Sequence, residues 1–356
     1  MSEAVLAATS HNSGLFYLKK VRKNVLLIAG LSLLTTFSFL TDISIGSSSF
    51  TLADVIRTIL QPESANGLLS VIVWDIRLPI ALIALLIGAI LALAGAQMQT
   101  ILNNPLADPF TLGISSAASF GAALAIVTGI SLIPFAGAYA VTGNAFVFSL
   151  IASFAIYGFT QIRGVTVETM ILVGIALMFT FNALLALLQY GASETQLQQV
   201  IFWMMGSLQR TSWNKIAVCT ALLVVCLPYC LQKAWMLMAL RMGDERARTM
   251  GVNVKRLRIQ MLIVISLLAS VSVAFVGAIG FIGLVAPHLA RMMVGEDQRF
   301  FLPVAALNGA LILSLTSIIS KSIVDGVIYP ISVITSLIGI PFFISLILAS
   351  RRKNWS

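Results

Sequence analysis

The most charged stretch of the chain, residues 233–258, contains the pattern of a short surface helix. Gly243 and Gly251 bound this pattern, in which the acidic residues come first and an arginine comes last, an order that complements the helix dipole. Ala247 and Met250 stand three residues apart and are therefore expected to share one face. The pattern fits two interpretations: a solvated connector, or a docking element that inserts into a groove of a partner protein.

Other chemical motifs are absent from the sequence. There is no G-x-x-x-x-G-K-[ST] phosphate loop, which excludes ATP binding by that device, and no spacing typical of metal ligands. The histidines are His11 and His288, and a lone histidine in an apolar segment is more often packed than a ligand. No charged residue stands in the middle of an apolar run, since Lys321 lies near the end of one. This disfavours a channel or proton-coupled carrier and leaves an energy source to be found outside the chain.

The composition identifies the elements that carry these residues. Of the 356 residues, 59% are apolar and 10% are charged, whereas soluble proteins have about 45–50% and about 25%. A membrane-spanning helix needs about 20 apolar residues, and the apolar runs lack the two-residue alternation of a β-barrel. The sequence therefore predicts an all-α integral membrane protein that forms one transmembrane domain over residues 1–356.

Ten transmembrane helices are predicted, and the charges support that number. With both termini in the cytoplasm, most of the 22 basic residues fall on the cytoplasmic side, as the positive-inside rule requires. This rule also explains the net charge of +9, because no nucleic-acid-binding motif accompanies it. An outer segment at 50–60 has helical apolar spacing and is predicted to lie along the membrane surface. The predicted spans are residues 25–42, 79–102, 110–128, 144–161, 169–190, 214–232, 259–278, 281–293, 302–320 and 331–350.

Two segments rich in glycine are each closed by a proline. The first runs from Pro79 to Pro105 through Gly88 and Gly95, and the second covers residues 277–291. Small residues allow helices to approach closely, and the residue before Pro105 is disfavoured in a helix. Such segments in both halves of a chain are typical of an internal repeat around a transport pathway, although tight packing alone explains the glycines equally well.

Six motifs together resemble the permease subunits of the iron-siderophore and vitamin B12 class of ABC importers, the FecCD or BtuC type. The resemblance extends from Arg77 to the C-terminus. It implies a BtuC-like type II importer fold, with ten transmembrane helices in each of two permease subunits. The motifs are Arg77-Leu78-Pro79, Asn-Pro-Leu-Ala-Asp-Pro at 104–109, Trp-Met-Met-Gly at 203–206, residues 240–251, residues 280–291 and Gly-Ile-Pro-Phe-Phe at 339–343.

The resemblance also implies partners. Two cytoplasmic ATPase subunits would hold ATP and Mg, and an extracytoplasmic binding protein would deliver the substrate. The chain itself would then be a transport subunit of the cytoplasmic (inner) membrane, with no catalytic group, cofactor or metal of its own. In the family, the segment matching residues 239–252 forms two short helices that meet the ATPase. The residues implied in coupling are Leu240, Arg241, Gly243, Asp244, Glu245, Ala247, Met250 and Gly251.

Gate and docking residues follow from the same resemblance. The implied inner gate comprises Asn104, Pro105, Leu106, Thr166, Val167 and Glu168. Glu168 is equally well explained as an acidic residue at a helix start. The implied docking residues for the binding protein are Arg77 and Lys321. Three charges that the family uses nearby are absent here, where the chain has Ile80, Ser317 and Ile328, so docking by salt bridges is expected to be weaker or shared with a different second subunit.

The predicted function is the import of a ferric siderophore. Haem or cobalamin is the alternative within the class, since small, weakly polar pathway residues fit any large chelate. An ion-coupled secondary carrier is the alternative from a different class. That alternative requires carboxylates within the membrane or a sodium site, and neither is visible in the sequence.

Overall fold

The computed structural model describes residues 3–46, 51–61, 67–134, 137–163, 166–324 and 326–353. Within these ranges the chain is helical, and its one β pairing is an isolated bridge between Val324 and Val327. The predicted all-α class is confirmed. Seven described helices are long and apolar enough to cross a membrane. Three shorter apolar helices, Ile114–Thr128, Ile282–Val294 and Ile331–Ser345, lie at the remaining predicted spans, so the total of ten stays a prediction.

The helices follow one another in a regular order. They are α1 (Glu3–Ser44), α2 (Leu52–Leu60), α3 (Gly67–Val71), the π-helical turn η2 (Ile72–Arg77), α4 (Leu78–Ile101), the 3₁₀ turn η3 (Pro109–Leu112), α5 (Ile114–Thr128), η4 (Gly137–Tyr139), α6 (Ala140–Arg163), α7 (Val167–Tyr190), α8 (Glu194–Met204), η5 (Leu208–Arg210), α9 (Trp213–Gln232), α10 (Ala234–Arg241), α11 (Asp244–Thr249), α12 (Val254–Val276), α13 (Ile282–Val294), α14 (Gln298–Ser322) and α15 (Ile331–Lys353).

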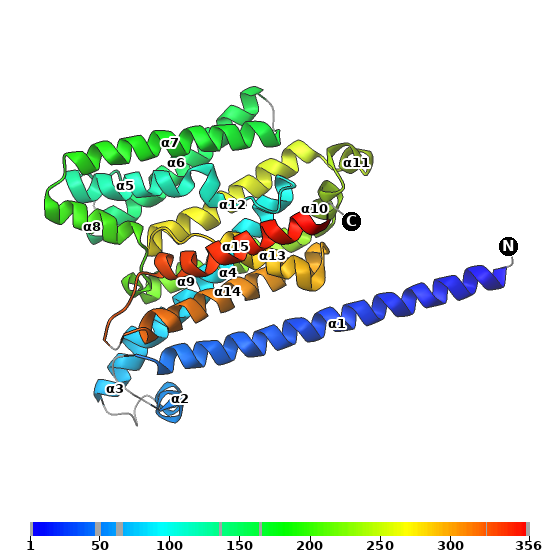
Figure 1. The fold of residues 1–356 in the computed structure, drawn as a ribbon, viewed down its shortest axis with the longest axis horizontal. Coiled ribbons are helices and arrows are strands. Elements are labelled where there is room, and N and C mark those ends of the chain that lie inside the picture. Colours follow the sequence, from blue (N-terminus) through cyan, green and yellow to red (C-terminus); the bar gives the residue numbers. More distant parts are fainter. Residues whose placement is uncertain are drawn as a thin grey trace.

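Two groups of helices are joined by α12 (Figure 1). The first group is α5 to α8, in which α5 packs against the other three. The second group is built around α4, which contacts α9, α13 and α14, while α1 covers α14. Helix α12 packs against α4 on one side and against α5 and α6 on the other. In Figure 1 the helices α10 and α11 lie at one end of the bundle and α2 lies at the other; these are called the α10–α11 end and the α2 end below.

Helix α4 is the core of the bundle. In its apolar stretch 83% of the residues are buried, against 17% in α7. A helix that is apolar on all sides is expected at such a central position. Its glycines lie where it crosses other helices. A Cβ added to Gly88 would stand 2.2 Å from the carbonyl oxygen of Gly309 on α14, so the two backbones are in contact.

The structure differs from the predicted boundaries at two spans. The helical segment that contains Pro79 begins at Gly67 rather than at 79, with the π-helical turn before α4. Pro79 does not end this segment because it stands in the first turn of α4, where its missing N–H is not needed. The first helix is also longer than predicted, and Figure 1 shows its N-terminal part extending beyond the bundle. The predicted helix at 50–60 is confirmed as α2, which Thr51 and Asp54 cap, whereas its place along the membrane surface stays a prediction.

Candidate functional site

The predicted surface helix is confirmed as α11, and α10 precedes it. Gly243 has a φ of 103° and Gly251 a φ of 82°, so both glycines adopt backbone conformations that other residues avoid. Ala247 is fully buried against the bundle, whereas Met250, which follows the last residue of α11, is 46% exposed. The shared apolar face that their spacing predicts stays a prediction, with one member packed and the other exposed.

The other predicted coupling residues divide in the same way. Leu240 is buried, and Arg241 and Asp244 are partly buried in ion pairs within the chain. Glu245 is exposed. The sequence analysis missed Met242, which is 51% exposed and lies between α10 and α11. Met242 and Met250, together with Trp235 on α10, therefore supply exposed apolar surface on this helix pair.

A buried arginine connects α11 to the end of α4. Arg258 on α12 donates two hydrogen bonds of 2.8 Å to the two carboxylate oxygens of Asp244. Its Nε also donates to the backbone carbonyl of Ile101 at 3.2 Å. The last carbonyls of a helix lack partners within the helix, so Arg258 satisfies one of them. The sequence analysis counted Arg258 only as a cytoplasmic charge, and no pattern distinguishes it from its basic neighbours.

A second chain of polar contacts connects α10 to the same turn of α4. Arg241 forms an ion pair with Glu296, which lies between α13 and α14. Arg291 on α13 lies 2.7 Å from the same Glu296 oxygen and donates to Gln99 Oε1 at 3.1 Å. The Gln99 amide in turn faces the carbonyl of Gly283 at 3.4 Å. Four polar side chains from separate elements thus meet at the last turn of α4.

The predicted gate loop follows that turn directly. Asn104 Oδ1 accepts a hydrogen bond from the backbone N–H of Leu106 at 2.9 Å, which closes a tight turn around Pro105. Leu106 is 45% exposed. Asp108, in contrast, is buried and accepts from the N–H of Phe110. Burial raises the pKa of Asp108 to about 6.

The second part of the predicted gate forms the start of α7. Thr166 caps this helix by accepting from the N–H of Thr169, Val167 packs against the main core, and Glu168 is exposed in the first turn. Helix α7 reaches the gate loop through η3, because Leu112 packs on Gly174. The position of Glu168 agrees with its interpretation as a helix-start acid. The gate itself stays a prediction.

At the α2 end, both predicted docking residues face inward. Arg77 is 6% exposed, and its guanidinium donates to the carbonyls of Ile43 and Ser44 at 3.1 and 2.8 Å. A cation suits this position, since α1 ends there. Lys321 forms an ion pair with Asp42 at 2.7 Å, and the Asp42 side chain is fully buried. The sequence analysis missed Asp42; the one available signal was an acidic residue at the end of the first apolar run.

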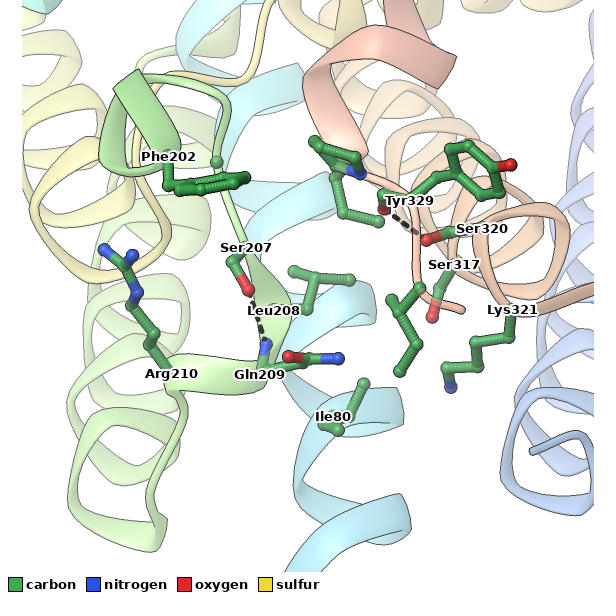
Figure 2. Close-up of a pocket in the computed structure, with 14 residues that line it drawn as sticks. Ile80, Phe202, Ser207, Leu208, Gln209, Arg210, Ser317, Ser320, Lys321 and Tyr329 are labelled. Atoms are coloured by element: carbon green, nitrogen blue, oxygen red, sulfur yellow. Dashed lines mark hydrogen bonds between the residues drawn. The ribbon is translucent and has the colours of Figure 1, made fainter. Parts of the chain in front are cut away.

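Asp42 on α1 supplies the acidic partner of Lys321 on α14. The hydroxyl of Ser317, at the position where the family has an acid, donates to Asp42 Oδ1 at 2.9 Å. Lys321 therefore keeps an acidic partner, supplied by α1 instead of by α14. Figure 2 shows Lys321 and Ser317 beside a hollow at this end of the bundle. The hollow has a volume of about 280 Å³ and is lined by Ile80, Phe202, Gly206, Ser207, Leu208, Gln209, Arg210, Ser317, Ser320, Lys321, Ile328, Tyr329, Pro330 and Ile331.

The remaining motifs pack against one another. Gly206 and Gly277, with φ of 70° and 80°, lie in contact, and a Cβ on Gly277 would meet the carbonyl of Trp203 at 2.5 Å. A Cβ on Gly339 would meet the ring of Phe281. The ring of His288 lies edge-on to that of Phe342, with centroids 6.0 Å apart. Among the described residues, no group of three metal-ligating side chains occurs.

A bundle of this kind, with a buried central helix and seven described helices long enough to span a bilayer, is typical of a multi-pass membrane protein. The model of the FecCD transport family matches residues 34–349, and the chain belongs to this family. The hemin transport system permease protein HmuU of Yersinia pestis is 37% identical over 315 residues, which cover 88% of this chain and 93% of HmuU. The vitamin B12 import system permease protein BtuC of Serratia proteamaculans is 37% identical over 278 residues, covering 77% and 81%.

A solved structure agrees with this assignment. The chain is similar to "An inward-facing conformation of a putative metal-chelate type ABC transporter", with a TM-score of 0.78 and 31% identity over 91% of this chain and 99% of the other. The resemblance drawn from the six motifs is thereby confirmed. The chain is an ABC importer permease of the FecCD and BtuC type.

Proposed function

We propose that this chain is the membrane subunit of an importer that carries a metal chelate across the cytoplasmic membrane, with a ferric siderophore as the first candidate. The relatives carry hemin and vitamin B12 by name, and the structural neighbour is described as of the metal-chelate type. Haem and cobalamin are therefore the alternative substrates. The observation that carries the proposal is the α10–α11 pair, which is tied by ion pairs to Arg258 on α12 and to Glu296 between α13 and α14.

Energy would come from partner chains. The sequence has no phosphate loop, so two cytoplasmic ATPase subunits would hold ATP and Mg. They would dock on the α10–α11 pair, where Met242 and Met250 are exposed. This places the α10–α11 end and both termini in the cytoplasm, in line with the basic residues of 233–258. A second permease subunit, identical or different, would complete the pathway within the bilayer.

Transport would use two states of the bundle. Closure of the ATPases on ATP would shift the α10–α11 pair, and the bundle would change between a state open to one side and a state open to the other. The gate would be formed by Asn104, Pro105 and Leu106 together with the start of α7 at 166–168. A loop closed by a proline can change shape without breaking a helix, which suits that role.

A binding protein would deliver the chelate at the α2 end, with Arg77 and Lys321 as proposed docking residues. Each lines a hollow there, yet each is also bonded within the chain. Direct docking through Arg77 and Lys321 would require their bonds within the chain to break. The two residues would otherwise contribute only by holding the surface at the α2 end in shape. Arg210, which lines the same hollow as Lys321, is a further positive charge at this end.

Reconstitution of the complete importer tests the proposal. The permease, its ATPase and its binding protein are placed in liposomes, and uptake of labelled ferric siderophore, haem and cobalamin is compared. We expect uptake of the siderophore that requires ATP on the ATPase side and survives an uncoupler. Uptake of haem or cobalamin but not of the siderophore would show that the proposed substrate is wrong. Uptake that continues without ATP and stops with an uncoupler would show that the chain is an ion-coupled secondary carrier instead.

A further inference from the structure

We propose that the last turn of α4, Gln99–Ile101, is the point at which both coupling helices act on the gate loop, and that Arg258 and Glu296 are the positioning residues that join them. The inference rests on the proposed function, because it concerns how ATP-driven motion reaches the gate. Neither residue stands in the predicted gate or in the predicted coupling segment, and neither lies on the exposed surface of α10 and α11.

The first connection starts at α11. Asp244 is the first residue of that helix, and Arg258 holds both of its carboxylate oxygens at 2.8 Å. Such a two-pronged contact fixes direction as well as distance. The same guanidinium donates to the carbonyl of Ile101, the last residue of α4. Arg258 is 5% exposed and the Asp244 side chain is 37% exposed, so water reaches this pair from the Asp244 side.

The second connection starts at α10. Arg241 is the last residue of that helix, and it shares the carboxylate of Glu296 with Arg291. The single negative charge of Glu296 is therefore shared between two arginines. Arg291 passes the contact on to Gln99, two residues before Ile101. The two connections start from different coupling helices and end within one turn of α4.

The backbone transmits a shift of that turn to the gate loop. The N–H of Asn104 donates to the carbonyl of Gln99 at 3.1 Å, and the N–H of Asn103 donates to that of Thr100 at 3.3 Å. Asn103 has a φ of 46°, in the left-handed region that residues other than glycine adopt less often. The helix therefore ends at one left-handed residue, directly between the turn that receives both connections and the loop that contains Leu106.

An exposed ion pair at the same end provides a contrast. Arg299 and Asp297 are bonded to each other at 2.7 Å at the start of α14, and the Arg299 side chain is 51% exposed. The two residues stand two apart at the start of α14, outside both connections described above. Arg299→Met therefore removes a charge pair of the same kind and is a matched control.

The test uses the complete reconstituted importer, with Asp244→Asn, Arg258→Met, their double variant, Glu296→Gln and the control Arg299→Met. ATP hydrolysis and substrate uptake are measured together. We expect each single variant to lower the substrate transported per ATP by about tenfold, within the range of coupling between two sites. In Arg258→Met and Glu296→Gln, which change no predicted coupling residue, hydrolysis and co-purification of the ATPase should stay near the unaltered values. The double variant should lose no more than its worse single variant, because the two residues act as one unit.

A spectroscopic measurement separates transmission from general damage. Spin labels are attached to cysteines placed at Met250 or at Leu106, both of which are exposed. ATP binding should alter both labels in the unaltered complex. In Arg258→Met the label at 250 should respond as in the unaltered complex, whereas the response of the label at 106 should be smaller, because only the connection through Glu296 remains. Unchanged responses at both positions, or substrate per ATP equal to that of Arg299→Met, would overturn the inference. Loss of all ATP-dependent uptake in the unaltered complex would instead refute the proposed function.

Discussion

Gly95 on α4 and Gly283 on α13 approach so closely that a Cβ added to Gly95 would lie 1.9 Å from the carbonyl oxygen of Gly283. No rotamer can relieve this contact, because the obstacle is backbone. The same α13 glycine lies against Asp108, whose Oδ1 would be 3.2 Å from a Cβ at position 283. The crossing therefore joins the two glycine-rich motifs of the sequence at one point.

Gly95→Ala should destabilise the protein because α4 and α13 must separate to admit the methyl group. Overpacking usually costs about 1–3 kcal/mol, and we expect the upper part of that range because backbone must move. Thermal unfolding in detergent measures the effect. Gly30→Ala on α1 is the control, since nothing lies within 4 Å of a Cβ there. An unfolding temperature for Gly95→Ala equal to that of the control would contradict the close crossing.

Lys321→Met should destabilise the α2 end, because it leaves the fully buried Asp42 without its cation. Removing one partner of a buried pair costs about 3–5 kcal/mol. The double variant Asp42→Asn, Lys321→Met should recover most of that loss, since it leaves no buried charge. Thermal unfolding of the three proteins tests both statements, and failure of the double variant to recover would show that the pair is not the cause.

The same double variant tests docking. It removes the positive charge at 321 from a protein that we expect to fold. Lower affinity for the binding protein, with unchanged thermal stability, would support a docking role for Lys321. Unchanged affinity would show that Lys321 pairs with Asp42 but takes no part in docking. A simple exchange to glutamate cannot separate these roles, because it would place two carboxylates together.

Asp108→Asn should change how stability depends on pH. The pKa of Asp108 is about 6 in the folded chain, above about 3.9 for an unperturbed aspartate. The folded state therefore binds this proton more tightly, so its contribution to stability rises as pH falls from about 6 towards 4 and is constant above that window. Two pKa units correspond to about 3 kcal/mol. The asparagine variant keeps an acceptor for the N–H of Phe110 but loses this dependence.

Unfolding temperatures between pH 5 and 7.5 measure that difference. The wild type should gain stability on acidification relative to Asp108→Asn. Asp297→Asn is the control. Hydrogen bonds from Arg299 lower the pKa of Asp297, so this group titrates below the window and its removal should leave the slope unchanged. Equal slopes for wild type and Asp108→Asn would exclude a raised pKa at Asp108.

Met250→Asp should weaken binding of the ATPase, because it places a charge in the exposed apolar surface at the end of α11. Loss of a buried methionine contact costs about 1.5–3 kcal/mol, so retention of the ATPase during purification should fall at least tenfold. Leu60→Asp makes the same kind of change at a residue that is 74% exposed on α2, at the opposite end. Equal retention of the ATPase by both variants would place the docking surface elsewhere.

The amino-acid sequence predicted the all-α class, the site of each apolar segment and the family, because these depend on composition and local order. The helix between Gly243 and Gly251 could be predicted for the same reason. Its orientation could not. Spacing placed Ala247 and Met250 on one face, whereas packing against the bundle buries one of them and exposes the other.

Charges were the least predictable part of the site. In the sequence, Arg77 and Lys321 look like exposed surface cations. In the structure, Arg77 donates to the carbonyls of Ile43 and Ser44, and Lys321 pairs with Asp42, all three on α1. Their partners lie more than 30 residues away in the chain, so no local sequence pattern reveals these contacts. Arg258 is similar, since nothing marks it among the basic residues around it until α12 places it between α11 and α4.

By itself, then, the sequence determined that the chain spans the membrane many times, which segments do so, and to which permease family it belongs. These properties follow from hydrophobic length and from the order of short motifs. Only the tertiary structure decided which charges are paired, which face of α11 is exposed, and that both coupling helices are tied to the last turn of α4. Those features depend on side chains brought together from distant helices, and their geometry arises only when close glycine crossings set how the helices pack.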